Sequence, residues 1–330
     1  MHSTPRNLLG ISGELDRILT EFGFLATHHK NDHPANTGDV SQVLSKETGE
    51  QLVSIFSDSI SPWFEIRELE GLASIRGDGR SGYRSEGIKD EKFYELTMTM
   101  ADRAFLITRT GSKIPAIEES IRIGEDGKLF NVVQVDASGR KIRLVYGNHQ
   151  YGSIPSIETH IHLLANALSI REGYANPATV HAHPYCLVSL GRHRRIHGSF
   201  EHFNAAIYTQ VEGLNRNYVD LIGVVPYFQS GTAALVGNSL EALVNHRLVL
   251  WMNHGFVVRE ANIRRAYTLL AYAEECARAA LFSLESKAIG LPMNEVRDFL
   301  LKHNLEKAFA ELFDEFGEGV DSEFNDEVSP

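Results

Sequence analysis

Apolar and polar positions in the first half of the chain predict two helices followed by strands. In residues 12–24 the apolar residues recur at helical spacing, and Ser12 stands where an N-cap residue would start the helix. A second helix is expected over residues 41–56. Residues 104–108 (AFLIT) form an apolar run typical of a strand. Residues 129–147 alternate with period two on both sides of Asp-Ala-Ser-Gly, which predicts a β-hairpin.

From residue 155 onward, helical and strand patterns alternate, which indicates an α/β protein. Helices are expected over residues 156–170, 199–216, 239–246 (with Ser239 as the N-cap), 262–285 and 294–312, and strands over residues 178–184, 218–226, 247–252 and 255–260. The sequence contains no internal repeat and no interdomain linker, so one domain over residues 61–290 is the simplest organisation. We expect a helical extension before it (residues 1–60), and a C-terminal helix (291–312) and a disordered acidic tail (313–330) after it.

Composition and charge limit the classes of partner. The chain has 330 residues, of which 43% are hydrophobic, and can bury a large core. Its net charge of −11 argues against a nucleic acid or an anionic membrane surface as partner. Two cysteines provide no disulfide framework, which favours a reducing compartment. The sequence shows neither a signal-peptide pattern nor an apolar run of about 18 residues, so we expect a soluble cytoplasmic protein.

Three histidines stand at the ends of apolar strands. Two are in VHAHPY (residues 180–185), and the third is in RLVLWMNHG (residues 247–255). Side chains alternate along a strand with period two, so His181 and His183 are expected to point to the same face. His254, from a neighbouring strand, would complete three nitrogen ligands and leave one position open, as a catalytic zinc ion requires. The alternative is two buried histidines bonded to backbone carbonyls and a third in a turn, and spacing alone does not decide between the two.

Glu158 is a second candidate for chemistry, in the first turn of a predicted helix. It could be a glutamate that simply matches the helix dipole, or a general acid/base held beside the metal. The N–H groups around Ser156, at the same helix start, could bind a phosphate. Thr110, Gly111 and Ser112 follow a strand and offer a second anion-binding turn, although hairpin turns use the same residue types.

Four segments of the chain resemble the class II aldolase/adducin family, and they occur in the family's order. They are PSIETHIH (155–162), VHAHPY (180–185), VPYFQSGT (225–232) and LVLWMNHG (248–255). The resemblance is closest to the family's branch of L-rhamnulose-1-phosphate and L-fuculose-1-phosphate aldolases. It implies a single class II aldolase-like domain with a mixed, mostly antiparallel sheet flanked by helices. It also implies cleavage of a ketose 1-phosphate to dihydroxyacetone phosphate and an aldehyde, in a homotetramer with active sites at subunit contacts.

The resemblance also implies roles for individual residues. His181, His183 and His254 match the family's ligands to Zn²⁺, or another divalent transition metal, and Glu158 matches the residue that moves protons there. The turns that bind the substrate phosphate match Thr110, Gly111, Ser112 and Ser156. Tyr227 and Thr232 are expected to pack near the metal pocket.

Two departures from the family pattern concern the phosphate. Family aldolases carry a G-N-x-S/T loop that contacts phosphate and enediolate, and we expect it at residues 70–76, where Leu72 replaces the asparagine. Ile157 replaces a second hydroxyl residue before Glu158. Whether the substrate is phosphorylated therefore stays open. A sugar-phosphate epimerase or dehydratase is the alternative on the same fold, although epimerases characteristically have aspartate at this glutamate. A non-catalytic adducin-like domain is a further alternative, although such domains lose the metal ligands.

Overall fold

A computed structural model of the chain describes residues 8–32, 38–66, 91–109, 117–122, 128–147, 155–196, 199–209, 221–286 and 292–302. All statements about structure below concern these residues. Three features discussed above lie outside the described residues: the expected phosphate-binding turn (Thr110, Gly111 and Ser112), Leu72, and the acidic tail over residues 313–330.

The described part of the chain is organised around one nine-stranded sheet, with strand order β2-β5-β4-β3-β1-β6-β9-β8-β7. Its strands are β1 (Gly38–Val43), β2 (Phe64–Glu65), β3 (Ala104–Thr108), β4 (Phe130–Val135), β5 (Lys141–Tyr146), β6 (Ala178–Ala182), β7 (Ile222–Val225), β8 (Leu248–Trp251) and β9 (Gly255–Glu260). Every neighbouring pair is antiparallel except β7 and β8, which run parallel. The expectation of a mixed, mostly antiparallel sheet flanked by helices is confirmed.

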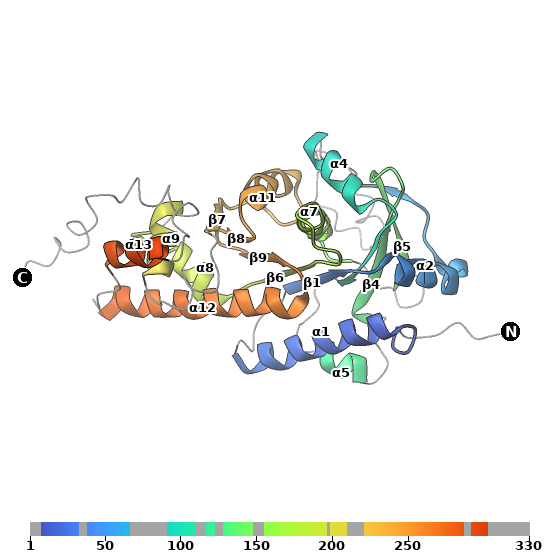
Figure 1. Cartoon of the computed structure of the whole chain (residues 1–330), viewed down its shortest axis with the longest axis horizontal. Coiled ribbons are helices and arrows are strands. Elements are labelled where there is room, and N and C mark those ends of the chain that lie inside the picture. Colours follow the sequence, from blue (N-terminus) through green and yellow to red (C-terminus); the bar gives the residue numbers. More distant parts are fainter. Residues whose placement is uncertain are drawn as a thin grey trace, which may run out of the picture.

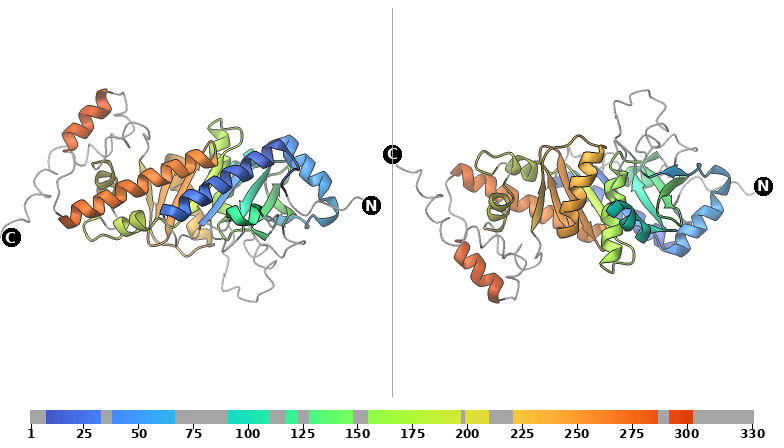
Figure 2. Two further views of the ribbon diagram at one scale, coloured as in Figure 1. Left: turned by 90° about the horizontal axis from the view of Figure 1, so that it is seen from below. Right: turned by 90° about the horizontal axis from the view of Figure 1, so that it is seen from above.

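Helices cover both faces of the sheet (Figures 1 and 2). The described helices are α1 (Gly13–Asp32), α2 (Lys46–Ile55), α4 (Glu91–Thr97), α5 (Ile117–Arg122), α7 (Thr159–Arg171), α8 (Tyr185–Gly191), α9 (Phe200–Tyr208), α11 (Ala233–Asn245), α12 (Ile263–Ser286) and α13 (Met293–Lys302), with short 3₁₀ turns at Ser57–Ser59 and Met98–Met100. Helices α7 and α11 lie over one face, and α1 and α12 lie side by side over the other. None of the helices in the described ranges is long and apolar enough to cross a membrane.

The sheet separates two apolar cores. Because side chains alternate along a strand, one strand can contribute residues to both cores. On β3, Leu106 packs into the core that includes residues of α1 and α12, whereas Phe105 and Ile107 pack into the core with α7 and α11. On β1 and β6, Val40 and Val180 face the α12 side. The residues that precede and follow these two valines in the sequence therefore face α7. The candidate site forms on this side of the sheet.

Three expectations about local structure are wrong. Residues 1–60 are not a purely helical extension, because β1 lies inside the sheet, paired with β3 and β6. The helix expected from residue 41 instead begins at Lys46, with Ser45 as its N-cap. Helix α11 begins at Ala233 and is capped by Thr232, whose side chain accepts the N–H of Leu235, rather than by Ser239. The other domain boundaries stay predictions.

Candidate metal centre and carboxyl pair

Strand β6 positions the first two histidines. His181 lies in the strand on the face toward α7, and His183 follows two residues later, so that their Nε2 atoms are 3.1 Å apart. After His183 the chain turns into α8, and Glu274 of α12 holds this turn in place. The buried carboxylate of Glu274 accepts the backbone N–H groups of Cys186 and Leu187, each at 2.8 Å. These two bonds satisfy donors that the start of a helix leaves free.

The tight turn between β8 and β9 supplies the third histidine. Asn253 has a φ of 60°, and the N–H of His254 donates to the carbonyl of Trp251 at 3.0 Å. The Trp251 ring stacks on the His254 imidazole, with 5.0 Å between ring centroids. Gly255 passes so close to β6 that a Cβ there would lie 2.6 Å from Cε1 of His181 and 2.8 Å from Cδ2 of His183. Only glycine fits at this position.

The three histidines form a cluster suited to a divalent metal ion. One ring nitrogen from each lies within 4.8 Å of the others. Nδ1 of His181 faces the carbonyl oxygen of Phe256 at 3.1 Å, so it carries the proton and leaves the lone pair on Nε2. Ligand nitrogens of a tetrahedral zinc ion are about 3.3 Å apart. The spacing of the Nε2 atoms of His181 and His183 is close to this value.

Burial keeps the imidazoles neutral, which is the form that binds metal. Burial, followed by the charges of His183 and His254, lowers the pKa of His181 well below its ordinary value. Burial also lowers the pKa of His183, and burial together with the charge of His183 lowers that of His254 to about 4. The sequence-based prediction of one cluster from these three residues is consistent with this geometry.

The carboxyl group of Glu158 lies beside the cluster. Glu158 stands at the N-cap position of α7 and is 5% exposed, with Oε1 3.9 Å from Nε2 of His254. Ser230 connects the two groups, because its hydroxyl is 3.2 Å from Nε2 of His254 and also hydrogen-bonds to Glu158. Burial raises the pKa of Glu158. A carboxyl group held beside a metal-binding cluster can accept a proton as a general base and return it as a general acid.

Asp39 completes the site, and the sequence-based prediction missed it. It lies opposite His181 in the pairing of β1 with β6, it is 7% exposed, and its carboxyl hydrogen-bonds to that of Glu158. Burial and repulsion from Glu158 raise the pKa of Asp39 well above its ordinary range. Residues 38–41 (Gly-Asp-Val-Ser) also fit the G-N-x-S/T pattern, with aspartate for asparagine, and begin β1, so this pattern could have pointed to Asp39. The loop expected at residues 70–76 lies outside the described residues.

Ser156 is part of the site, but its hydroxyl is already bound. Its Oγ lies 2.5 Å from Oδ2 of Asp39 and 3.2 Å from Oε2 of Glu158, and it accepts the N–H of Glu158 at 3.1 Å. Tyr227 is 60% exposed, and Thr232 is the N-cap of α11.

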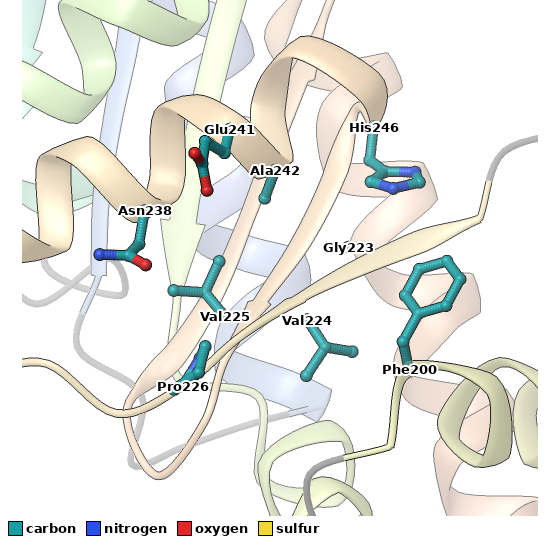
Figure 3. A pocket seen from close by; sticks show the side chains of 9 residues that line it. All are labelled: Phe200, Gly223, Val224, Val225, Pro226, Asn238, Glu241, Ala242 and His246. Atoms are coloured by element: carbon teal, nitrogen blue, oxygen red, sulfur yellow. The ribbon is translucent and has the colours of Figure 1, made fainter.

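A separate pocket opens at the edge of the sheet. This cavity of about 230 Å³ lies between β7, α9 and α11 (Figure 3). Its lining consists of Phe200, Gly223, Val224, Val225, Pro226, Asn238, Glu241, Ala242 and His246. None of the candidate site residues lines it.

Comparison with known proteins shows the family. The model of the Class II Aldolase and Adducin N-terminal domain matches residues 95–281. The rhamnulose-1-phosphate aldolase of Listeria monocytogenes serotype 4a is 20% identical over 178 residues, which cover 54% of this chain and 62% of that enzyme. The Yersinia pestis (strain Pestoides F) rhamnulose-1-phosphate aldolase is 24% identical over 199 residues, covering 59% of this chain and 70% of that enzyme.

Among solved structures, a sugar-phosphate aldolase from Thermotoga maritima has a TM-score of 0.55 at 20% identity, over 83% of this chain and 97% of that one. This likeness concerns the fold. The chain spans somewhat under two thirds of the Listeria enzyme, and the family model alone covers more than half of the chain. The chain belongs to the class II aldolase and adducin family.

Proposed function

We propose that the protein is a metal-dependent aldolase that cleaves a ketose, or a ketose phosphate, into a three-carbon ketone and an aldehyde. The observation that supports this most is the histidine cluster with ring nitrogens within 4.8 Å and a buried carboxyl 3.9 Å from His254. The names of the curated relatives make ketose 1-phosphates and their unphosphorylated counterparts the substrates to test.

In this proposal His181, His183 and His254 hold Zn²⁺ or another divalent transition metal. When bound, such an ion supplies Lewis-acid stabilisation of the negative charge that develops on the substrate oxygens. Cleavage removes the proton of the C4 hydroxyl, forms the aldehyde carbonyl at C4 and leaves the electron pair of the C3–C4 bond on the ketone fragment. Glu158 delivers one proton to C3, so that the proton lost at oxygen is balanced by the one gained at carbon. Ser230 holds this carboxyl toward His254.

The test separates the role of Glu158 from metal binding. Glu158→Gln is expected to lower kcat by on the order of 10²–10⁴-fold while leaving the bound metal unchanged. Glu50→Gln, at an exposed carboxyl on α2, is the matched control and is expected to keep the wild-type kcat and the bound metal. A screen of ketose 1-phosphates against unphosphorylated ketoses, with metal supplied, identifies the substrate. Retained turnover in Glu158→Gln, or purified protein with less than one tightly bound divalent metal per chain, would count against the proposal.

We further propose that the protein assembles as a homotetramer. Tyr185 and Tyr227 support this, because these two aromatic side chains follow β6 and β7 and are 76% and 60% exposed. Large exposed aromatic side chains are typical of surfaces covered by another chain. Light scattering after size exclusion measures the mass, and a monomeric mass would overturn this part of the proposal.

A further inference from the structure

The indole ring of Trp251 packs against two of the three clustered histidines. It stacks on the His254 ring with 5.0 Å between centroids and an interplanar angle of 28°. The centroid of the His181 ring is 4.7 Å away, at an angle of 42°. Trp251 is 1% exposed, so both contacts are shielded from water. One buried side chain thus touches two candidate metal ligands.

The contact with His181 crosses a strand. Trp251 ends β8 and His181 lies in β6, with β9 between them in the sheet. Strands that are two apart in a sheet are separated by about 10 Å, so the two rings must lean toward each other over β9. Gly255, at the start of β9, pairs directly with Trp251 and has no side chain to separate the rings. The glycine that leaves room for the histidines therefore also lets the indole reach His181.

Filling space does not require an indole at this position. A buried tryptophan N–H usually has a hydrogen-bond partner, and a buried donor without one destabilises the folded state. Nε1 of Trp251 is buried and has no partner among the residues that the structure describes. A phenylalanine would fill most of the same space without burying this donor. The indole is accounted for if its larger ring interacts with the imidazoles more favourably than a smaller ring would.

Metal binding supplies such an interaction. An imidazole that donates its lone pair to a divalent cation takes on part of the positive charge of that cation. The face of an indole attracts a positive charge within about 6 Å of the ring centroid more strongly than other aromatic faces do, and the attraction is larger where water is excluded. Both imidazole centroids are within this distance of Trp251. The stacking is therefore more favourable when the histidines hold a metal ion than when they do not.

We propose that Trp251 is a positioning residue that strengthens metal binding through the negative charge on its ring face, by stacking on His181 and His254. It acts through the two imidazoles, because an indole N–H is a donor only and offers no lone pair to a metal. The inference rests on the proposed metal-dependent function with these histidines as ligands. It goes further by assigning part of the metal affinity to a residue that has no metal-binding group.

Fluorinated tryptophans test the charge on the ring face with little change in its shape. The chain has two tryptophans, so in Trp63→Phe only Trp251 is replaced when a tryptophan analogue is incorporated. Trp63 precedes β2 at the far end of the sheet and packs under the guanidinium of Arg143, so Trp63→Phe itself should bind Zn²⁺ like the wild type. Zn²⁺ affinity is measured by competition with a chromophoric chelator for tryptophan, monofluorotryptophan and difluorotryptophan. We expect it to fall with each added fluorine, by about 3-fold or more over the series.

Replacement of the side chain gives a second measurement. Trp251→Phe is expected to lower the Zn²⁺ affinity by about 3- to 10-fold, and Trp251→Leu by about 10-fold or more. Phe22→Leu is the control, at a buried ring of α1 that packs against Phe130. It should lower the Tm of the metal-free protein and leave the Zn²⁺ affinity unchanged. If Trp251→Leu does not fold, the fluorinated series decides.

The possible outcomes separate the inference from the function on which it rests. Equal Zn²⁺ affinity with all three tryptophans would overturn the inference, because only the shape of the ring would then matter, and would leave the metal-dependent function in place. An equal loss of affinity in Phe22→Leu and Trp251→Phe would overturn it as well. Wild-type protein that binds no Zn²⁺ would overturn the proposed function, and the inference with it.

Discussion

Asp39 lies directly opposite His181 in the antiparallel pairing of β1 with β6. Side chains of directly paired residues lie on the same face of a sheet, and this face is the one that α7 covers. Glu158, at the start of α7, hydrogen-bonds to Asp39 and lies 3.9 Å from Nε2 of His254. One register between two strands thus places a carboxyl pair at the edge of a histidine cluster.

Removal of one imidazole is expected to abolish tight metal binding. His181→Ala deletes one of three nitrogens that lie within 4.8 Å of one another, and should weaken binding by more than about 100-fold. His193→Ala, whose imidazole accepts the N–H of Arg195 outside the cluster, should bind metal like the wild type. Competition with a chromophoric chelator measures both affinities. Equal affinity in the two variants would show that the ion binds elsewhere.

Gly255→Ala is expected to disrupt the cluster without removing a ligand. The new methyl group would lie 2.6 Å from the His181 ring, 2.7 Å from the carbonyl oxygen of Ala182 and 2.8 Å from the His183 ring. The rings or the turn must therefore shift, and the metal affinity should fall.

Gly237→Ala is the matched control for this glycine. Gly237 lies within α11 and has no heavy atom within 4 Å of the position of a new Cβ. It should leave the metal affinity unchanged and raise the free energy of unfolding by about 0.5–1 kcal/mol, as alanine does in helices. Metal titration and urea unfolding check both variants. Unchanged affinity in Gly255→Ala would mean that the ligands do not require this close approach.

Much of the fold and all three histidines of the cluster could be predicted from the sequence, because local patterns indicate them. The period-two pattern of residues 129–147 predicted a β-hairpin, and the structure has β4 and β5 in these residues. The H-x-H spacing and the third strand-end histidine led to one cluster. The prediction of β1 failed, since GDVSQV contains only two apolar residues and is nevertheless buried at all six positions. Its polar side chains form hydrogen bonds with partners that are distant in the sequence.

Asp39 was missed for the same reason. An aspartate in a polar, turn-rich stretch gives no sign of burial. Its partners Ser156 and Glu158 lie 117 and 119 positions away, and only the tertiary structure brings them together. Ser41 shows the same effect, because its hydroxyl contacts Nδ1 of His162 at 2.8 Å and accepts a hydrogen bond from Asn166. Long-range hydrogen bonds between polar residues leave no periodicity to read.

Glu274 is expected to stabilise the turn that follows the H-x-H segment. Glu274→Ala leaves two buried N–H groups, those of Cys186 and Leu187, without their acceptor and should lower the free energy of unfolding by about 1–3 kcal/mol. Because α8 begins right after His183, the metal affinity should fall as well. Glu275→Ala, which breaks only an exposed pair with Arg278 at 2.7 Å, should cost less than about 1 kcal/mol and leave metal binding intact. Similar losses in both variants would contradict this role.

His160 is expected to make the stability of the metal-free protein fall in mild acid. Its Nε2 lies 2.6 Å from the carbonyl oxygen of Ile66, and burial lowers its pKa from 6.5 to about 4. Between these two values the unfolded chain binds more protons than the folded one. The contribution of His160 is therefore fully present above about pH 6.5 and is lost as the pH falls toward 4. The loss is on the order of 3 kcal/mol, since one pKa unit corresponds to about 1.4 kcal/mol.

His160→Gln removes this titration and keeps a donor for the Ile66 carbonyl. Urea unfolding of both proteins with a chelator present, from pH 8 to pH 4.5, separates the two contributions, because the metal ligands titrate alike in each. The variant should be less stable than the wild type at pH 8, where the packing of the imidazole is lost. Its free energy of unfolding should then fall less steeply below pH 6.5, so that the gap between the proteins narrows in acid. A gap that stays constant over this range would show that His160 titrates alike in the folded and unfolded states.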